Sequence, residues 1–414
     1  MQAKPKIILF LYNRLFDPLI QSNFWLYIKD CLEDESNTYQ FHLITYENSE
    51  FPLTKEQENL VAQWKSQGLE WSTLTWHQGS GLKQKFIDLF NGFLRVTKLR
   101  FKGYKHIVTL GSIAGTYAYT YCIPLRLKLF LYQYEPHSEY AIDNKMWPKD
   151  SKQYKISHYL ERRAARAAKV VASGTVFMQR RVKEEWQSKA EFFRIPTVAN
   201  DKKFIFNNHD RIEVRKQYNI GMDKWVLYYP GKFGDLYYKE EFAFMYKWLK
   251  EEEPRLHLLI VTPHTDQEVT ELFEIANVAS SDYTIAHCDY VDIHKYASAS
   301  DFAIISVPPG PSKKFISNIK VGEYLCAGIP FLITKGISED YIYATEKDVG
   351  VVVDDFVKAD IKKAWPEIKE YLERDSDKLR NHCRSVGLDY RGFDNLNRIF
   401  KLALTSLTSH QINK

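Results

Sequence analysis

The sequence lacks the short motifs that identify several large enzyme classes. A Walker A loop, a GxSxG elbow and an HExxH helix are all absent, which argues against P-loop enzymes, serine hydrolases and zincins. The single DxD triplet, Asp375 to Asp377, lies between two helical stretches. Asp375 is therefore expected to cap a helix, and we predict no metal site here or elsewhere in the chain.

Cysteine pairs and long apolar runs are missing as well. The five cysteines are odd in number, widely spaced and outside any CxxC motif: Cys31, Cys122, Cys288, Cys326 and Cys383. We therefore expect reduced thiols rather than a disulfide framework or a zinc site. No apolar run approaches the roughly 20 residues of a membrane-spanning helix, and Met1 to Phe10 is too short and strand-like for a signal peptide. A cytoplasmic protein is expected.

The length and composition indicate a folded protein of two domains. The chain has 414 residues, of which 45% are hydrophobic and 26% charged, and this is too long for one ordinary core. A polar stretch between Ile195-Pro196 and Asp223 is the expected junction. We predict an N-terminal domain over 1–200, a second domain over 201–390, and a helix over 391–414 that returns to the first domain.

Apolar runs of strand length alternate with helical patterns in both halves. The expected strands are Lys6 to Tyr12, Phe41 to Thr45, His106 to Leu110, Lys128 to Tyr132, Val170 to Ala172, Trp225 to Tyr229, Leu256 to Val261, Tyr283 to Ala286, Phe302 to Ser306, Phe331 to Thr334 and Val349 to Val353. This alternation predicts an α/β protein with two Rossmann-like βαβ domains, mainly parallel sheets and a helical C-terminal tail. Ligands of such sheets bind at the carboxyl ends of the strands.

Positive charge is concentrated in the first half. Residues 1–200 contain 28 Lys and Arg against 19 Asp and Glu, which leaves 29 against 33 for the remainder. The segment 83–105 interleaves apolar and basic residues in the pattern of an amphipathic helix. Such a helix suits an anionic membrane surface or lipid-linked acceptor, a solvated face of a soluble domain, or nucleic acid. An anionic membrane surface stays open as a partner of residues 83–105, and no nucleic-acid partner is predicted.

The segment Ser317 to Pro330 carries the strongest binding signal. Ser317 or Asn318 can cap a helix that Gly328 ends before Pro330, and Lys320 and Glu323 then share one face. A helix N-terminus with a nearby cation suits a phosphate, and a carboxylate one turn further can accept two hydrogen bonds from a ribose diol. We therefore predict a nucleotide site.

A second candidate is the loop after the strand that begins at Trp225. Gly231 and Gly234 permit close approach of the backbone, and Lys232 stands where a cation could neutralise a diphosphate. Lys239, near the start of a helix expected over Tyr237 to Lys250, could add a second positive charge. A structural turn remains the alternative for this loop taken alone.

The two segments together resemble the donor-binding half of GT-B glycosyltransferases, specifically the large retaining family 4. Gly231-Lys232 and the run Lys320 to Pro330 match its motifs. The resemblance implies two Rossmann-like domains facing each other across a cleft. It also implies that loop cations hold the nucleotide diphosphate and that Glu323 binds the ribose. This chain departs from the family at Phe315, where a second Glu is common, at Lys232, which replaces an arginine, and at Asn318, which replaces a proline.

The first domain offers candidates for acceptor chemistry. The segment Tyr134 to Glu139 follows an expected strand and precedes a helical Leu-Glu-Arg segment, Leu160 to Arg162, as in family members. His137 could bind the sugar or orient the acceptor hydroxyl, and Glu135 could take its proton. A solvated loop with an incidental histidine is the alternative, and Gly111-Ser112 is a further crevice candidate.

Together with the predicted nucleotide site, the family resemblance implies a glycosyltransferase that moves a sugar from a nucleotide-diphosphate sugar to a glycan or lipid-linked acceptor in surface polysaccharide or glycoconjugate synthesis. Lys232, Lys320, His137 and Glu135 are the expected catalytic residues. The expected nucleotide contacts are Gly231, Lys232, Lys239, Ser317, Asn318, Lys320 and Glu323. No permanently bound cofactor is predicted, and the reaction is expected to be metal-independent. The family resemblance alone implies that it is retaining. A catalytically silent binding module of the same fold, and a nucleotide-sugar epimerase or hydrolase, remain open alternatives.

Overall fold

The computed structural model describes residues 4–77, 82–133 and 135–409. The chain forms two compact units. The first comprises Met1–Pro196 together with Leu396–Lys414, and the second comprises Thr197–Asn395. No helix within the described residues is both long and apolar enough to cross a membrane.

The first unit is built on a parallel sheet of seven strands within the described residues, in the order β3-β2-β1-β4-β5-β6-β7. Its strands are β1 Lys6–Leu11, β2 Gln40–Glu47, β3 Glu70–Thr75, β4 His106–Leu110, β5 Lys128–Tyr132, β6 Val170–Ser173 and β7 Glu191–Arg194. The chain runs outward from β1 to β3 and then returns to the other side of β1 as β4. The order of strands therefore reverses between β1 and β4, where a crevice is expected at the carboxyl edge.

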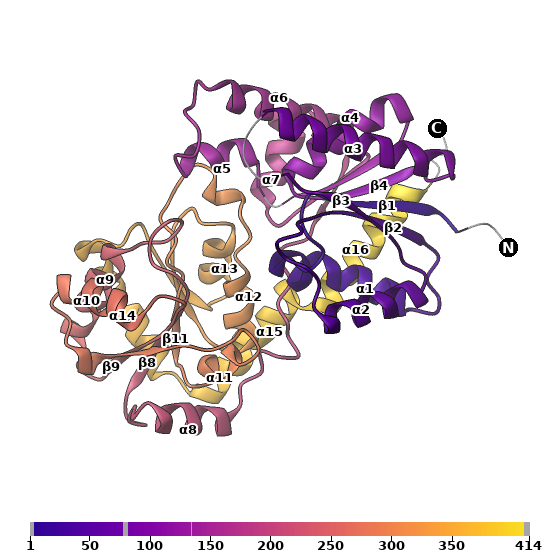
Figure 1. The fold of residues 1–414 in the computed structure, drawn as a ribbon. Helices are drawn as coiled ribbons and strands as arrows, with labels where there is room; N and C mark the ends of the chain where they lie inside the picture. The colour runs from indigo at the N-terminus through magenta and orange to yellow at the C-terminus, as the bar shows by residue number, and fades with distance from the viewer. Residues whose placement is uncertain (1–3, 78–81, 134, 410–414) are drawn as a thin grey trace. The chain divides into compact units, whose positions relative to one another are not determined.

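Helices cover both faces of this sheet (Figure 1). The connections of the first unit contain the helices α1 Trp25–Glu33, α2 Lys55–Ser66, α3 Leu82–Phe101, α4 Ser112–Leu125, α5 His137–Asp143, α6 Lys152–Ala167 and α7 Val176–Arg180, with π-helical turns at Ile20–Phe24 and Arg181–Glu185. Right-handed crossovers place α1 and α2 on one face and α3, α4 and α6 on the other. The helices α3, α4 and α6 lie side by side.

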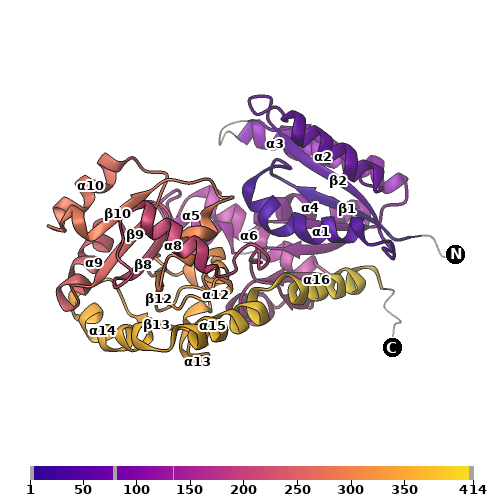
Figure 2. The same ribbon diagram turned by 90° about the horizontal axis from the view of Figure 1, so that it is seen from below.

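The last helix, α16 Phe393–Thr408, packs beside α1 (Figure 2). The ring of Phe400 stacks on Tyr27 at 4.9 Å between centroids and meets the edge of Phe24 at 6.0 Å. Lys401 forms ion pairs with Asp30 at 2.8 Å and with Asp34 at 3.2 Å. Apolar burial and paired charge thus both attach the C-terminal helix to the first unit.

The second unit has a parallel sheet of six strands in its described residues, in the order β10-β9-β8-β11-β12-β13. These are β8 Trp225–Pro230, β9 Leu256–Val261, β10 Tyr283–Ala286, β11 Phe302–Ile304, β12 Phe331–Thr334 and β13 Gly350–Val353. Its order reverses between β8 and β11, so the loops after these two strands border the expected ligand crevice.

Two apolar layers sandwich the second sheet. The surrounding helices are α8 Asn208–Gln217, α9 Glu240–Glu252, α10 Asp266–Ile275, α11 Ile293–Ser298, α12 Ile319–Cys326, α13 Asp340–Glu346, α14 Lys358–Glu373 and α15 Ser376–Arg391, with short 3-10 turns at Ser280–Asp282 and Lys313–Phe315. The helices α9, α10 and α14 contribute to one layer, while α12 and α15 contribute to the other. All eleven predicted strands are confirmed, but β3 and β7 were not predicted.

The structure also tests the predicted Asp375 cap and the predicted start of the helix after β8. Asp375 caps α15 by accepting a hydrogen bond from the backbone N–H of Lys378 at 2.9 Å, as the position of the DxD triplet indicated. The helix expected over Tyr237 to Lys250 was placed three residues too early, because α9 begins at Glu240.

Candidate functional site

The N-terminus of α12 is held by a side-chain cap. Asn318 is the N-cap residue, and its Oδ1 accepts a hydrogen bond from the backbone N–H of Lys320 at 3.0 Å. Gly328 lies just beyond the helix with φ of +76°, a conformation that favours glycine. The predicted helix therefore forms, and of the two proposed caps Asn318 is the one used.

Ser317 is tied into a buried network instead. Its Oγ accepts hydrogen bonds from the backbone N–H of Thr197 at 2.9 Å and from the Arg391 guanidinium at 2.9 Å. Arg391 is fully buried and also pairs with the buried Asp340. The network fixes the segment that leads into α12, so the Ser317 side chain acts in the structure as an anchor.

Gly231 and Lys320 meet although they lie far apart in the sequence. A Cβ atom built on Gly231 would lie 2.5 Å from the Lys320 Nζ, so the absence of a side chain creates the space that the ammonium occupies. The same Nζ lies 4.4 Å from the ring centroid of Tyr237 and 5.5 Å from that of Tyr229. Burial lowers the pKa of Lys320 from 10.5 to about 8, against the opposing effect of the Glu323 charge. The ammonium is thus poorly solvated but still mostly protonated at neutral pH.

Glu323, one turn further along α12, is a buried carboxyl group that is 5% exposed. Its Oε1 accepts a hydrogen bond from the Tyr290 hydroxyl at 2.8 Å. Burial raises the pKa of Glu323 from 4.5 to about 7, although the Tyr290 hydroxyl and the charges of Lys320 and Lys203 act to lower it. The Glu323 carboxyl therefore has a second oxygen that can accept hydrogen bonds from nearby hydroxyl groups, in a position with little exposure to water.

Lys203 and Tyr290 complete this charged group, and neither was predicted. The Lys203 ammonium donates a hydrogen bond to the Tyr290 carbonyl and lies 3.8 Å from the centroid of its ring. Burial lowers the pKa of Lys203, against the opposing effect of the Glu323 carboxylate. Tyr290 comes four residues after the end of β10, so its position beyond a strand end was a usable signal. Lys203 lies in the irregular segment before α8, where the sequence gives no such signal.

A cavity of about 710 Å³ opens beside these groups. Its walls come from the carboxyl ends of β8, β9 and the segment after β10, namely Pro230, Gly231, Val261, Thr262, Pro263, His287, Cys288, Asp289, Tyr290 and Ile293. Gly231 and Tyr290 thus line the cavity directly, and they contact Lys320 and Glu323 respectively. The volume is in the range of small-molecule sites in proteins.

The two other predicted donor cations do not line this cavity. Lys232 and Lys239 are both exposed. The Lys232 carbonyl accepts a hydrogen bond from the Tyr229 hydroxyl, which fixes the loop backbone. Lys239 lines a separate cavity of about 460 Å³ together with Phe233, Gly234 and His264. Phe315, the departure from the family motif, is buried in the 3-10 turn Lys313–Phe315.

The predicted acceptor residues lie at the start of α5, and Tyr134 is outside the described residues. His137 is the first residue of the helix, where its ring meets the edge of Trp147 at 5.3 Å between centroids. Burial lowers the pKa of His137, so the neutral imidazole is favoured. The Glu135 carbonyl accepts a hydrogen bond from the Ser112 hydroxyl at 2.7 Å, which links the two candidate segments.

The glutamate of the Leu-Glu-Arg segment caps α5. Glu161 is 3% exposed and accepts hydrogen bonds from the Ser138 backbone N–H at 3.0 Å and from the Ser138 hydroxyl at 2.5 Å. Burial raises the pKa of Glu161 to about 7. Its hydrogen bonds position the helix that carries His137, and this role is structural.

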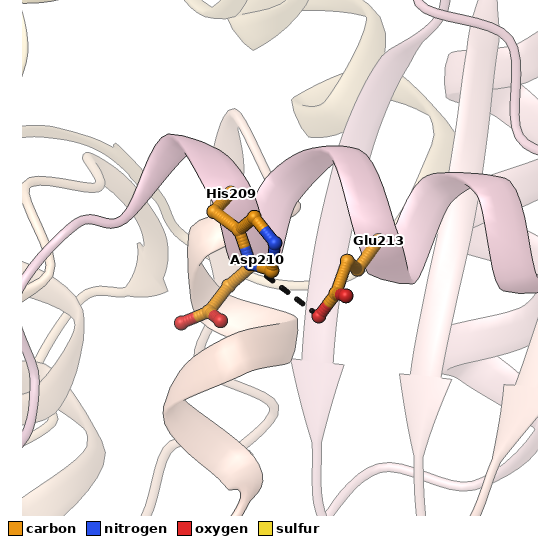
Figure 3. Close-up of side chains that lie close together, drawn as sticks. All are labelled: His209, Asp210 and Glu213. Atoms are coloured by element: carbon orange, nitrogen blue, oxygen red, sulfur yellow. Dashed lines mark ion pairs between the residues drawn. The ribbon is translucent and has the colours of Figure 1, made fainter.

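Three potential metal ligands cluster on α8, namely His209, Asp210 and Glu213 (Figure 3). The His209 Nδ1 lies 3.5 Å from a Glu213 carboxylate oxygen, and both side chains are largely exposed. Residues four apart on a helix commonly form such pairs. The cluster is thus accounted for as an exposed ion pair with a neighbouring carboxylate.

Comparisons with known proteins identify the fold. No protein-family profile matches the sequence, and no curated protein matches it. Sucrose-phosphate synthase from Thermosynechococcus elongatus aligns over 97% of this chain and 99% of its own, with a TM-score of 0.69 and 14% identity. A glycosyltransferase from Rickettsia africae ESF-5 aligns over 98% and 100%, with a TM-score of 0.67 and 14% identity. HepE of Anabaena, solved with UDP-glucose, aligns over 97% and 99%, with a TM-score of 0.63 and 12% identity.

Identities this low establish similarity of fold rather than of activity. The two parallel sheets and these neighbours confirm the predicted α/β fold of the GT-B glycosyltransferase type.

Proposed function

We propose that the protein is a glycosyltransferase that uses a nucleotide-diphosphate sugar as donor. The observation that carries the proposal is the convergence of Gly231, Lys320 and Glu323 at the carboxyl edge of the second sheet, beside a cavity of about 710 Å³. Solved neighbours of the same fold include HepE in complexes with UDP and with UDP-glucose. In this proposal the Lys320 ammonium and the N-terminus of α12 bind the diphosphate, while Glu323 binds the ribose.

The proposed chemistry follows from the charge that develops on the leaving group. The bond between the anomeric carbon and the diphosphate oxygen breaks, and its electron pair stays on the diphosphate. A bond from the acceptor oxygen to the anomeric carbon forms, and the acceptor releases a proton. A poorly solvated ammonium stabilises the new negative charge more strongly than one in water. Lys232 and Lys239 add exposed positive charge in the loop that follows β8.

The finer assignments remain part of the proposal. We propose a retaining, metal-independent reaction of the family 4 type that acts in surface polysaccharide or glycoconjugate synthesis. The first unit would bind a glycan or lipid-linked acceptor, with His137 and Glu135 near it. The proposed location is the cytoplasm, at the inner face of the membrane.

Thermal-shift measurements with UDP, GDP, ADP and CMP sugars test donor binding. A ligand at 100 times its dissociation constant stabilises the folded protein by about 2.7 kcal/mol, so the donor should raise the melting temperature clearly. Lys320→Ala and Glu323→Ala should abolish that rise, whereas Lys363→Ala, an exposed lysine on α14, should retain it. If no nucleotide sugar stabilises the wild-type protein or is turned over, the protein is a silent module of this fold. Product analysis distinguishes transfer from epimerisation or hydrolysis.

We also propose that the first unit docks on an anionic membrane through α3, α4 and α6. The helices α3 and α6 contain five basic residues each. The only acidic residues on α3, α4 and α6 are Asp88 and Glu161, and both are buried. Large apolar side chains are exposed on the same helices: Phe86, Ile87, Phe90, Leu94, Phe101, Ile113, Ile123, Ile156 and Tyr159. Each basic residue near an anionic surface contributes about 1 kcal/mol of attraction.

Vesicle sedimentation tests this surface. The protein should sediment with vesicles of phosphatidylcholine mixed with phosphatidylglycerol and stay in the supernatant with phosphatidylcholine alone. Phe86→Ser combined with Phe90→Ser should weaken sedimentation, because both side chains are at least half exposed on α3. Leu402→Ser, which alters a half-exposed side chain on α16, is the matched control. Equal recovery of the protein with both vesicle types would contradict the proposal.

A further inference from the structure

Three arginines surround one carboxylate at the amino edge of the second sheet. Asp301 lies directly before β11, and its Oδ1 is 2.8 Å from the guanidinium of Arg211. Its Oδ2 is 2.8 Å from the guanidinium of Arg215, and Oδ1 is also 3.7 Å from that of Arg380. Arg211 and Arg215 belong to α8, and Arg380 belongs to α15. A single carboxylate is therefore shared by three positive charges.

Arg380 has hydrogen-bond donors that the folded chain leaves unused. The residue is 7% exposed, and its Nη2 donates a hydrogen bond to the Ser300 carbonyl at 2.7 Å. Its Nε and Nη1 are buried and have no hydrogen-bond partner within the described residues. The Phe206 ring, whose centroid lies 4.1 Å from the guanidinium carbon, offsets only part of the lost hydration. Burial lowers the pKa of Arg380 from 12.5 to about 10, although the charge of Asp301 acts to raise it. Since buried donors normally have partners, the surroundings of this guanidinium satisfy it incompletely.

Arg380 also lines a cavity of about 210 Å³. The other charged residues of the lining are the basic Arg211, Lys224 and Arg374 and the acidic Asp223 and Asp301. Arg374 is already neutralised by two carboxylates, each at 2.8 Å. Asp223 is exposed, and Lys224 adds a partly exposed ammonium. The cavity therefore has an excess of positive charge, in a space less than a third as large as the cavity beside Lys320.

This cavity and the proposed nucleotide site lie at opposite edges of the second sheet. Lys224 directly precedes β8 and Asp301 directly precedes β11, whereas Gly231 directly follows β8. Since a strand rises about 3.3 Å per residue, the six residues of β8 separate the two sites by about 20 Å. The volume lies below the range of about 300–1,000 Å³ that is usual for sites of drug-sized ligands, so a small anion suits it better than a nucleotide sugar.

We propose that the cavity lined by Arg380 is a second anion site, which binds inorganic phosphate or a small phosphomonoester. The phosphate oxygens accept charge-assisted hydrogen bonds from Lys224 and Arg211, and the incompletely neutralised charge of Arg380 attracts the anion. In a phosphomonoester, the organic part packs against the apolar side chains of Met222 and Leu379. The site is separate from the proposed donor site and goes beyond the proposed glycosyltransferase function.

The alternative is that the arginines only brace α8 and α15 against the sheet. Arg215 has this role, because it donates hydrogen bonds to three backbone carbonyls, those of Ala299, Gly221 and Lys224. If Arg380 had only the same role, phosphate would bind no better than another salt of the same ionic strength. Removal of the Lys224 ammonium would then change nothing.

Isothermal titration calorimetry with the full-length protein separates the two interpretations. The probes are inorganic phosphate and glycerol 3-phosphate, and sodium chloride at matched ionic strength is the blank. Every protein carries Lys320→Ala, so that phosphate bound at the proposed donor site does not contribute. In this background we expect phosphate to bind, and Lys224→Ala should weaken binding by about tenfold or more because one charge-assisted hydrogen bond is lost. Lys363→Ala, which removes an exposed lysine on α14, is the matched control and should keep the affinity.

The two probes identify the source of the phosphate group. Tighter binding of glycerol 3-phosphate would assign the site to a phosphomonoester, and equal or weaker binding would assign it to inorganic phosphate. Arg380→Met should abolish the binding of both, and if this variant does not fold, Lys224→Ala decides. Absence of binding of either probe at millimolar concentration, or an affinity that Lys224→Ala leaves unchanged, would overturn the inference. Either result leaves the proposed glycosyltransferase function intact, because no nucleotide sugar takes part in the test.

Discussion

Replacing Glu323 by glutamine should stabilise the protein at alkaline pH and weaken nucleotide binding at the same time. On folding, burial raises the pKa of this carboxyl from 4.5 to about 7. The folded state therefore holds the proton more tightly than the unfolded state does. Stability is lost as the pH rises from 4.5 to 7, and the loss is complete above pH 7. A tenfold change in proton affinity corresponds to about 1.4 kcal/mol. Ionisation of Glu323 therefore lowers the free energy of unfolding of the ligand-free protein by about 3 kcal/mol.

Glutamine has the shape of the protonated acid and can still accept the hydrogen bond of Tyr290, but it carries no charge. We therefore expect Glu323→Gln to raise the free energy of unfolding by about 3 kcal/mol at pH 8 and by almost nothing at pH 4. Urea unfolding at both pH values measures the difference. Glu274→Gln, which alters an exposed carboxyl on α10, should change stability by less than about 0.5 kcal/mol at either pH.

The same substitution should lower the affinity for the donor by about tenfold or more, because hydrogen bonds to a charged acceptor contribute about 1.5–3 kcal/mol. Thermal shifts at several donor concentrations give this affinity. Destabilisation of Glu323→Gln at pH 8, or a stability difference that is the same at pH 4 and pH 8, would refute the reasoning about the buried charge.

Three further substitutions test neighbouring contacts. Gly231→Ala should fold with a modest loss of stability but bind the donor about tenfold more weakly or worse by thermal shift, because the new Cβ would displace the flexible end of Lys320 and would lie 3.3 Å from the hydroxyl of the buried Tyr229. Tyr290→Phe should move the pH-dependent loss of stability to higher pH in urea unfolding, because its hydroxyl lowers the pKa of Glu323. Arg391→Met should lower the free energy of unfolding by about 3–5 kcal/mol, because Asp340 would stay buried without its charged partner, whereas the exposed Arg255→Met should cost less than about 1 kcal/mol.

The sequence predicted those parts of the fold whose side chains are buried on both faces. Strands such as β9, with six buried residues, read as unbroken apolar runs. The strands β3 and β7 are edge strands, and their residues are exposed or only partly buried. Their sequences therefore mix polar and apolar residues without a continuous run. The edge strands β10 and β13 of the second sheet contain buried residues and were predicted, whereas β3 and β7 contain none and were missed.

Only those residues of the candidate site that lie within one short sequence motif were predictable. Lys320 and Glu323 share a capped helix, and the spacing alone placed them on one face. The contact between Gly231 and Lys320 depends on how two loops of the second sheet meet, which a spacing cannot specify. A single sequence has no pattern that identifies residues brought together only by tertiary packing.

Two kinds of buried charge in the second unit support the functional interpretation of α12. Arg391 and Asp340 are both fully buried but pair directly, and Thr197 and Ser317 accept further hydrogen bonds from the guanidinium. Lys320 and Glu323 are different, because burial lowers the pKa of the lysine and raises that of the glutamate despite their mutual attraction. Burial thus disfavours the charged form of each group. A diphosphate beside Lys320 and a ribose beside Glu323 would offset this cost, as a nucleotide-binding role requires.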